Sequence, residues 1–200
     1  MDKKRQLGTL KKEMEGDKNL PLRKGATQLV FGEGNPNADI YFLGEGPGYW
    51  EDQKGRPFVG QAGKLLSQLL ESIGLKREEV YISNIVRFRP PENRDPTPDE
   101  IKAFEPYVDR EIDIIKPKII VTLGRISMGK FLPDVLISRV HGKPQTLSWH
   151  SHDIVVIPMY HPAAALRRGE LLEQMREDFK VIPKILEEIK IEKTEQMNLI

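Results

Sequence analysis

Residues 38–74 read ADIYFLGEGPGYWEDQKGRPFVGQAGKLLSQLLESIG, and this stretch decides the fold. It begins with a short apolar run, Ala38 to Leu43, that ends at a glycine and is typical of a buried strand. A long glycine-rich loop follows from Gly44 to Gly60, and loops of this length inside a compact domain usually carry function. From Gln61 to Ile73 apolar residues recur at helical spacing, and Gly74 then ends the pattern. The stretch therefore predicts a strand, a functional loop and a helix.

The same order of elements recurs along the rest of the chain. Short β-branched runs predict further strands at 79–86, 118–123 and 153–158. Helices are expected at about 1–16, 98–116, 125–132 and 162–190, and an irregular polar segment at 133–152. This alternation predicts an α/β fold, specifically a three-layer α/β/α sandwich around a central four-stranded parallel sheet. No repeat or linker divides the chain, so we expect a single domain over 1–200, with a core at about 20–190 and a flexible tail at 191–200.

The composition excludes several classes of protein. The chain has 200 residues, of which 38% are hydrophobic and 30% charged, enough for one core. Its 31 basic and 30 acidic residues leave a net charge of +1, so any contact with nucleic acid must come from a local patch. Apolar runs stay far below the ~20 residues of a membrane span, so we expect no membrane partner. The N-terminus lacks the apolar segment of a signal peptide, which predicts a cytoplasmic protein.

The chain contains no cysteine, which excludes disulfides, thiolate nucleophiles and metal sites that use cysteine ligands. His141, His150 and His152 are not accompanied by a cluster of carboxylates, so we interpret them as surface residues. The prediction is therefore that the chain has no metal site.

Polar side chains follow three of the predicted strands at the point where each strand ends. Glu45 lies in the GEGPG turn after the first strand, Asn84 ends the second, and His161 follows the fourth. The carboxyl ends of parallel strands meet at one edge of a sheet, so a carboxylate, a carboxamide and an imidazole should share one cleft. A dinucleotide site is disfavoured, because the GEGPG turn lacks the third glycine of that fingerprint and its carboxylate would repel a pyrophosphate.

Basic residues gather in the segments that follow the strands. Phosphate backbones bind to such rims of positive charge, although each residue alone also fits an ordinary solvated loop. The cations of this rim are Lys54, Arg56, Arg87, Arg89, Arg94, Arg139, His141, Lys143, Arg167 and Arg168.

Four ordered motifs resemble the family 4 uracil-DNA glycosylases. They are GEGPGYWEDQKGRPFVGQAGKLL, VYISNIVRFRPPENR, IIKPKIIVTLGR and YHPAAALR, and together they span roughly residues 20–185. The resemblance implies an enzyme that flips uracil out of single- or double-stranded DNA. It would hydrolyse the N-glycosidic bond, leave an abasic site and initiate base excision repair. The alternative is a non-catalytic DNA-binding module on the same fold.

The resemblance also implies roles for individual residues. Glu45 would stabilise the sugar cation or orient the water, and His161 would donate to the uracil oxygen that gains negative charge. Asn84 would pair with uracil N3–H and O4, and Phe58 would stack on the base. The remaining expected uracil contacts are the Gly46 N–H and Glu51. The expected DNA contacts are Arg56, Arg87, Arg89, Leu166 and Arg167, with Leu166 or Arg167 filling the space that the flipped nucleotide leaves.

The chain departs from this family at its iron–sulfur cluster. The four cysteines that hold the cluster correspond to Asp17, Leu20, Phe88 and Phe104, and three of these four side chains are apolar. We therefore expect no cluster and no cofactor, with apolar packing in its place.

The last five residues, Gln196 to Ile200 (QMNLI), resemble the short peptide by which bacterial repair proteins dock on the sliding clamp. A frayed terminus is the alternative interpretation. Apart from this docking, a monomer associated with the nucleoid is expected.

Overall fold

A mixed six-stranded sheet forms the centre of the protein. The computed structural model describes residues 2–150 and 152–198, and side chains beyond Ile191 are not part of this description. The strands lie in the order β1-β3-β2-β4-β6-β5. Their bounds are β1 Glu33–Gly34, β2 Ile40–Gly44, β3 Tyr81–Asn84, β4 Ile119–Leu123, β5 Gln145–Trp149 and β6 His152–Met159. The four central strands β3, β2, β4 and β6 are parallel, while β1 and β5 run antiparallel at the two edges.

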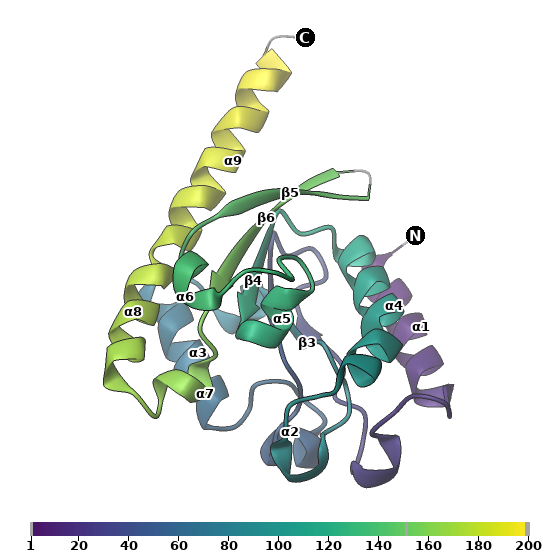
Figure 1. The fold of residues 1–200 in the computed structure, drawn as a ribbon. Helices are drawn as coiled ribbons and strands as arrows, with labels where there is room; N and C mark the ends of the chain where they lie inside the picture. Colours follow the sequence, from purple (N-terminus) through teal and green to yellow (C-terminus); the bar gives the residue numbers. More distant parts are fainter. Residues whose placement is uncertain (1, 151, 199–200) are drawn as a thin grey trace.

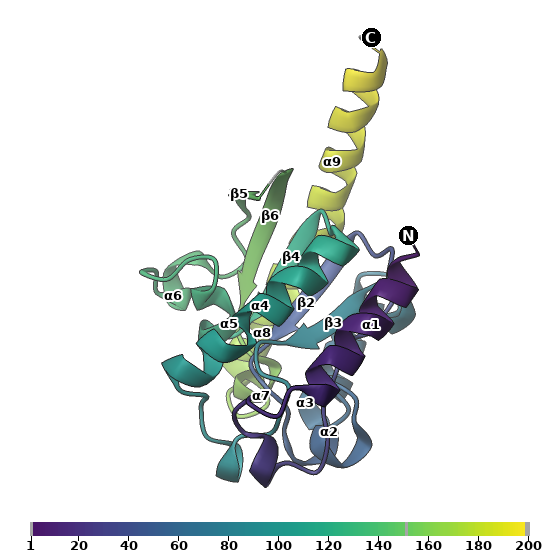
Figure 2. The same ribbon diagram turned by 90° about the vertical axis from the view of Figure 1, so that its right-hand side faces the viewer.

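Helices cover both faces of the sheet, as Figures 1 and 2 show. On one face α1 (Lys3–Gly16) lies against α4 (Pro98–Ile115), and their apolar side chains pack on Tyr41, Leu43 and Ile120. The other face is covered by α3 (Gln61–Ser72), α7 (Pro162–Ala165), α8 (Gly169–Phe179) and the first turns of α9 (Val181–Asn198). Two separate apolar cores, one on each face, confirm the three-layer α/β/α architecture.

The capping residues of α4 show how the sequence sets a helix boundary. The Thr97 hydroxyl accepts a hydrogen bond from the Glu100 N–H at 3.3 Å, and the Glu100 carboxylate accepts one from the Thr97 N–H at 2.8 Å. Pro98 occupies the first helical position, where a missing N–H has no cost. From this boundary α4 presents Phe104 and Val108 to the core.

The expectation of a four-stranded, all-parallel sheet holds for the central strands but is wrong for the edges. Segment 133–152, expected to be irregular, contains α6 (Ile137–Val140) and the edge strand β5. Every second side chain of β5 is exposed, so its sequence QTLSW lacks the apolar run that marks the inner strands. The loop from Gly44 to Gly60 also contains a short helix, α2 (Tyr49–Lys54), below the length at which helical periodicity is readable.

The parallel strands bring four of their carboxyl ends to one edge of the sheet, and Figure 1 shows α2 and α7 at this edge. The remaining short elements are α5 (Arg125–Gly129) and the 3-10 turns Arg23–Gly25, Arg77–Glu79 and Pro91–Asn93. Within the described ranges, no helix combines the length and the apolar character needed to cross a bilayer.

Candidate active site

The predicted convergence of strand ends is present at the carboxyl edge of β2 and β3. Gly44 at the end of β2 pairs in register with Asn84 at the end of β3. A Cβ atom at position 44 would lie 2.6 Å from two atoms of the Phe58 ring, and it would also collide with the Asn84 carboxamide. Glycine therefore allows the ring and the carboxamide to lie directly against the backbone at the end of β2.

Asn84 presents a hydrogen-bonding group that the described part of the chain does not satisfy. Its side chain is 2% exposed, and its Oδ1 has no hydrogen-bond partner. A buried polar atom without a partner is costly, typically by ~1–3 kcal/mol, so such atoms in native structures commonly await a ligand or water. The Asn84 Oδ1 can thus accept a hydrogen bond from the donor of a ligand.

Phe58 is held in a strained backbone conformation by contacts on both sides. Its φ of 52° lies in the left-handed region, which non-glycine residues rarely adopt. The Arg77 guanidinium donates to the Phe58 carbonyl at 2.9 Å, and to the Pro57 carbonyl as well. The ring centroid lies 5.8 Å from that of His161, so the loop fixes one aromatic wall of the site against the imidazole.

Glu51 fixes the same loop from its other side. Its Oε1 accepts hydrogen bonds from the backbone N–H groups of Val59 at 2.8 Å and Gly60 at 2.7 Å. Glu51 thereby positions the segment that carries Phe58. Both of these bonds use one carboxylate oxygen, and the expected contact of Glu51 with uracil stays a prediction.

His161 is held as a neutral hydrogen-bond donor. It caps α7, and its Nδ1 accepts a hydrogen bond from the Ala163 N–H at 3.1 Å. Burial lowers the pKa of His161 to about 4, although the Glu51 carboxylate acts in the opposite direction. A neutral imidazole whose Nδ1 accepts carries its proton on Nε2.

Glu45 has an unusual pKa for a carboxyl group. Burial, followed by the nearby Asp95 carboxylate, raises its pKa to about 7, while the Arg125 guanidinium partly opposes this change. Asp95 and Arg125 pair with each other at 2.8 Å. Near neutral pH the Glu45 carboxyl group therefore exists in both its protonated and its ionised form.

Among the expected DNA contacts, Leu166 is 50% exposed and Arg167 is exposed beside it. Arg56 is exposed and pairs with Glu33 at 2.7 Å. Arg89 lies over the ring of Tyr49, with its guanidinium carbon 5.2 Å from the ring centroid. The expected contacts of these four side chains with DNA stay a prediction.

The expectation that Arg87 contacts DNA is wrong, because its side chain is fully buried. Its guanidinium pairs with Glu111 of α4 at 2.7 Å and also donates to the Ser83 hydroxyl. The Tyr41 hydroxyl donates to the same Glu111 carboxylate at 2.5 Å. Arg87 is therefore part of a buried charge network that joins the end of β3 to α4.

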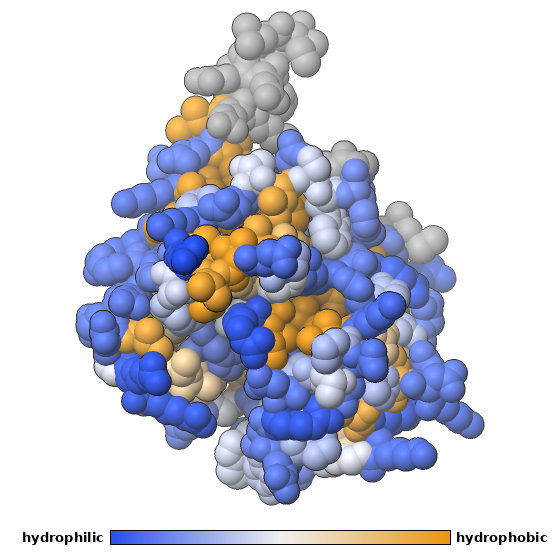
Figure 3. Space-filling model, in the orientation of Figure 1, coloured by the Kyte–Doolittle hydropathy of each residue, from blue (hydrophilic) through white to orange (hydrophobic). Residues whose placement is uncertain are grey.

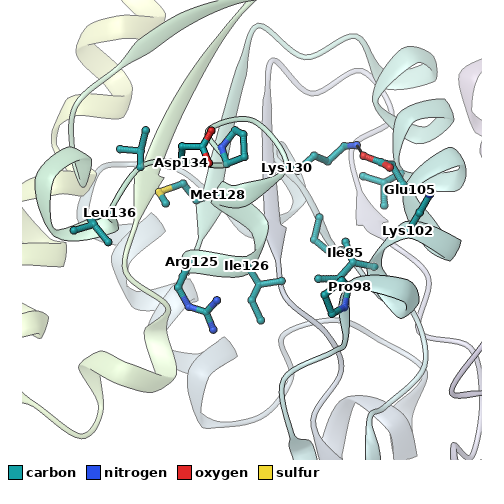
Figure 4. A pocket seen from close by; sticks show the side chains of 15 residues that line it. Ile85, Pro98, Lys102, Glu105, Arg125, Ile126, Met128, Lys130, Asp134 and Leu136 are labelled. Atoms are coloured by element: carbon teal, nitrogen blue, oxygen red, sulfur yellow. Dashed lines mark hydrogen bonds and ion pairs between the residues drawn. The ribbon is translucent and has the colours of Figure 1, made fainter.

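A hollow on the surface lies beside this site, and Arg125, which acts on Glu45, is among its lining residues. It has a volume of about 710 Å³ and lies between α4, α5 and the segment after α5. Figure 4 shows its apolar wall of Ile85, Ile126 and Met128, and Figure 3 shows apolar surface in this region among charged side chains. Glu45, Asn84 and His161 are not among its lining residues, so it is not the reaction site.

The comparison with protein families agrees with this site. The model described as "Uracil DNA glycosylase superfamily" matches residues 31–188. This chain belongs to the uracil-DNA glycosylase superfamily. The match covers all three strand ends that carry Glu45, Asn84 and His161 and confirms the family resemblance drawn from the motifs.

Curated relatives place the chain near one branch of this superfamily. It is similar to the Type-4 uracil-DNA glycosylase of Sulfurisphaera tokodaii, with 50% identity over 88% of this chain and 83% of the relative. The Type-4 enzyme of Archaeoglobus fulgidus shows 44% identity over 88% of this chain and 91% of the relative. The Type-4 enzyme of Thermotoga maritima shows 44% identity over 80% of this chain and 84% of the relative.

This superfamily member does not fit an iron–sulfur cluster at the four positions expected for one. Leu20, Phe88 and Phe104 are buried in one core, with the two phenylalanine centroids 6.2 Å apart. The Asp17 carboxylate accepts a hydrogen bond from Tyr107 at 2.8 Å. The expected apolar packing is confirmed at the three apolar positions, and these side chains offer no sulfur or imidazole to iron. Among the described residues, no group of three or more potential metal ligands occurs.

Some residues of this uracil-DNA glycosylase site were not recognised from the sequence. Asp95 and Arg125 flank Glu45, and Arg77 supports the loop of Phe58. Arg125 lies two residues after the end of the strand 118–123, so its position after a strand end was a usable signal. Arg77 precedes a strand and gave no such signal. The exposed aromatic pair Tyr49 and Trp50 lies inside the GEGPG motif segment and was also overlooked.

Proposed function

We propose that this chain excises uracil from DNA, as the names of its Type-4 relatives indicate for those proteins. The observation that carries the proposal is the buried Asn84 carboxamide, whose Oδ1 has no partner in the described part of the chain and lies close to Gly44, as the Phe58 ring does. Uracil presents a donor, N3–H, next to an acceptor, O4. One carboxamide can satisfy both through its oxygen and its NH₂ group.

The same carboxamide explains discrimination against cytosine. Cytosine presents an acceptor and an amino donor in the opposite order, so it would place donor against donor and acceptor against acceptor. Such a mismatch leaves buried polar groups unpaired, which is the strongest basis for selectivity between similar ligands. Phe58 supplies a fixed apolar wall for the ring of the base.

The reaction breaks the bond between the sugar C1′ and uracil N1. The electron pair of that bond leaves with uracil and collects on its oxygens, while positive charge develops on the sugar. His161 donates a hydrogen bond from Nε2–H to the uracil oxygen, and a neutral imidazole suffices because it need not transfer the proton. Ionised Glu45 stabilises the sugar cation and accepts one proton from the water whose oxygen bonds to C1′.

The base must leave the helix to reach this buried site. Leu166, which is half exposed and follows α7, or Arg167 beside it would occupy the gap in the base stack. Arg167 beside it, with Arg56 and Arg89, would contact the phosphates. The resulting abasic site is the product with which base excision repair begins.

Release of free uracil from a uracil-containing oligonucleotide tests the proposal. We expect the wild type to release uracil and Glu45→Ala to be at least ~100-fold slower, a typical loss for one general base or one electrostatic group. Glu188→Ala, an exposed carboxylate on α9, is the matched control and should retain the wild-type rate. Binding of DNA without uracil release by the wild type would instead support the non-catalytic binding module.

We further propose that the protein works without a metal or an iron–sulfur cluster. The support is the packing of Leu20, Phe88 and Phe104 at the positions where the resembled family carries cysteines. Purified protein should contain no stoichiometric iron and show no broad visible absorbance. Stoichiometric iron would contradict the proposal.

The remaining expectations concern partners and location. We propose a single-domain monomer that acts in the cytoplasm on nucleoid DNA. We also propose that the C-terminal peptide Gln196 to Ile200 docks on a sliding clamp, although its side chains lie outside the described part of the chain. Unchanged clamp binding after deletion of residues 196–200 would overturn the docking.

A further inference from the structure

Two aromatic side chains stand exposed beside the proposed reaction site. Tyr49 is 49% exposed and Trp50 is 57% exposed, and both begin α2, four and five residues after Glu45. Large aromatic side chains are usually buried for most of their surface, so an adjacent exposed pair calls for an explanation.

The pair is held in a fixed arrangement. The two ring centroids lie 5.2 Å apart in an edge-to-face geometry, and the Arg89 guanidinium covers the Tyr49 ring. Arg89 is itself fixed by a hydrogen bond from its Nε to the Asn93 side chain at 2.8 Å. The exposed indole therefore has a supported position, which lowers the entropic cost of binding to it.

Trp50 also borders a small hollow with unpaired positive charge. The hollow has a volume of about 240 Å³ and is lined by Trp50, Lys54, Val59, Gly60, Gln61 and Lys64. In the described part of the chain, Lys54 and Lys64 have no acidic group within ion-pair distance. This volume is below the ~300–1,000 Å³ of typical small-molecule sites, so it suits one base or one phosphate.

The hollow is rigidly connected to the site of base recognition. Gly60, which lines it, donates its N–H to Glu51, and the same carboxylate oxygen holds Val59 next to Phe58. A nucleotide bound at Trp50 would therefore lie close along the surface to the base that rests against Phe58.

We propose that Trp50, with Lys54 and Lys64, forms a second nucleotide subsite that stacks an unpaired base next to the uracil on the same strand. This inference rests on the proposed function, because the neighbouring base belongs to the uracil-containing strand. An aromatic face flanked by cations is the usual device for binding single-stranded nucleic acid without sequence preference. In an intact duplex the neighbouring base is stacked and paired, so the subsite favours single-stranded substrate.

The kinetic test compares Trp50→Ala and Trp50→Phe with Leu136→Ala as the control. Leu136 is an apolar residue that is 61% exposed and lies outside both proposed sites. On single-stranded uracil oligonucleotides we expect Trp50→Ala to raise KM by ~10-fold or more with kcat little changed, and Trp50→Phe to restore most of the affinity. The effect should disappear when an abasic spacer replaces the neighbouring nucleotide on one side of the uracil. It should also be smaller on duplex DNA.

If Trp50→Ala raised KM equally on the spacer and the normal substrate, or left KM unchanged, the proposed subsite would be overturned.

A second measurement does not depend on catalysis. The chain has two tryptophans, so Trp149→Phe leaves Trp50 as the single tryptophan, whose fluorescence can be excited selectively over that of the tyrosines. Thymine oligonucleotides should quench its fluorescence, and abasic oligonucleotides of equal length should not. If the wild type releases no uracil, the proposed function fails while this quenching still decides the subsite.

Discussion

The titration of Glu45 gives the sharpest test of the proposed chemistry. Its pKa is raised from the ordinary 4.5 to about 7, and only the ionised carboxylate can stabilise the sugar cation or accept a proton from water. With a pKa of about 7, ~10% of Glu45 is ionised at pH ~6 and ~90% at pH ~8. We therefore expect kcat/KM to rise ~9-fold between these pH values, whereas an ordinary glutamate would give a nearly flat profile.

Two single substitutions should move this profile in opposite directions. Asp95→Asn removes a negative charge near Glu45 and frees Arg125 from its ion pair, so the pKa of Glu45 should fall. Arg125→Gln removes the positive charge and frees Asp95, so the pKa should rise. Both side chains are about two-thirds exposed, so each change is worth ~0.2–1 kcal/mol, or ~0.2–0.7 pH units.

The assay is uracil release measured as kcat/KM, which reports the pKa of the free enzyme. His161 does not obscure the result, because its pKa of about 4 lies below the measured range. Glu45→Gln should be slow and independent of pH. A flat wild-type profile from pH ~6 to ~8, or shifts of the same sign for Asp95→Asn and Arg125→Gln, would refute the reasoning.

Three further predictions concern stability. Glu45→Gln should stabilise the fold by ~1–2 kcal/mol above pH ~8 and by nothing below pH ~4, after allowance for its partial exposure. The sign follows because the pKa of Glu45 is raised to about 7 in the folded state, so the wild type loses stability as the pH rises from 4.5 through 7, whereas the uncharged glutamine does not. Thermal unfolding of both proteins at the two pH values checks this prediction. Glu111→Leu should cost ~3–5 kcal/mol in urea unfolding by stranding the buried Arg87 charge, and adding Arg87→Met should recover most of it; a double variant as unstable as the single one would contradict this. Phe104→Ala should cost ~3–5 kcal/mol, because it empties the fully buried position that packs on Phe88, and a loss below ~1 kcal/mol would contradict that packing.

The central strands were predictable because most of their residues are buried and they lie in short, mainly apolar runs of sequence. Strand β5 was not predictable in the same way, since its two faces meet different surroundings and its alternating residues are partly polar. Strand β1 has two residues, too few for any periodicity. In both cases tertiary pairing at a sheet edge, rather than local preference, makes the strand.

The convergence of Gly44 with Asn84 was predictable because parallel topology alone brings carboxyl strand ends together. The burial of Arg87 was not predicted, because a charged residue after a strand gives no sign of whether it faces solvent or the interior. The sequence around its partner Glu111 did indicate a buried ion pair. Glu111 lies on the same helical face as Phe104, Val108 and Ile115, and a carboxylate buried among apolar side chains requires a cation as its partner.

The buried network and the apolar packing act on the same segment of chain. Arg87 and Phe88 are consecutive, and each is fixed to α4, the first through Glu111 and the second through Phe104. This double attachment begins three residues after Asn84, so it anchors the end of β3 where the carboxamide must be held. A metal cluster would provide one such tie through covalent ligands. Here an ion pair and an aromatic contact provide two.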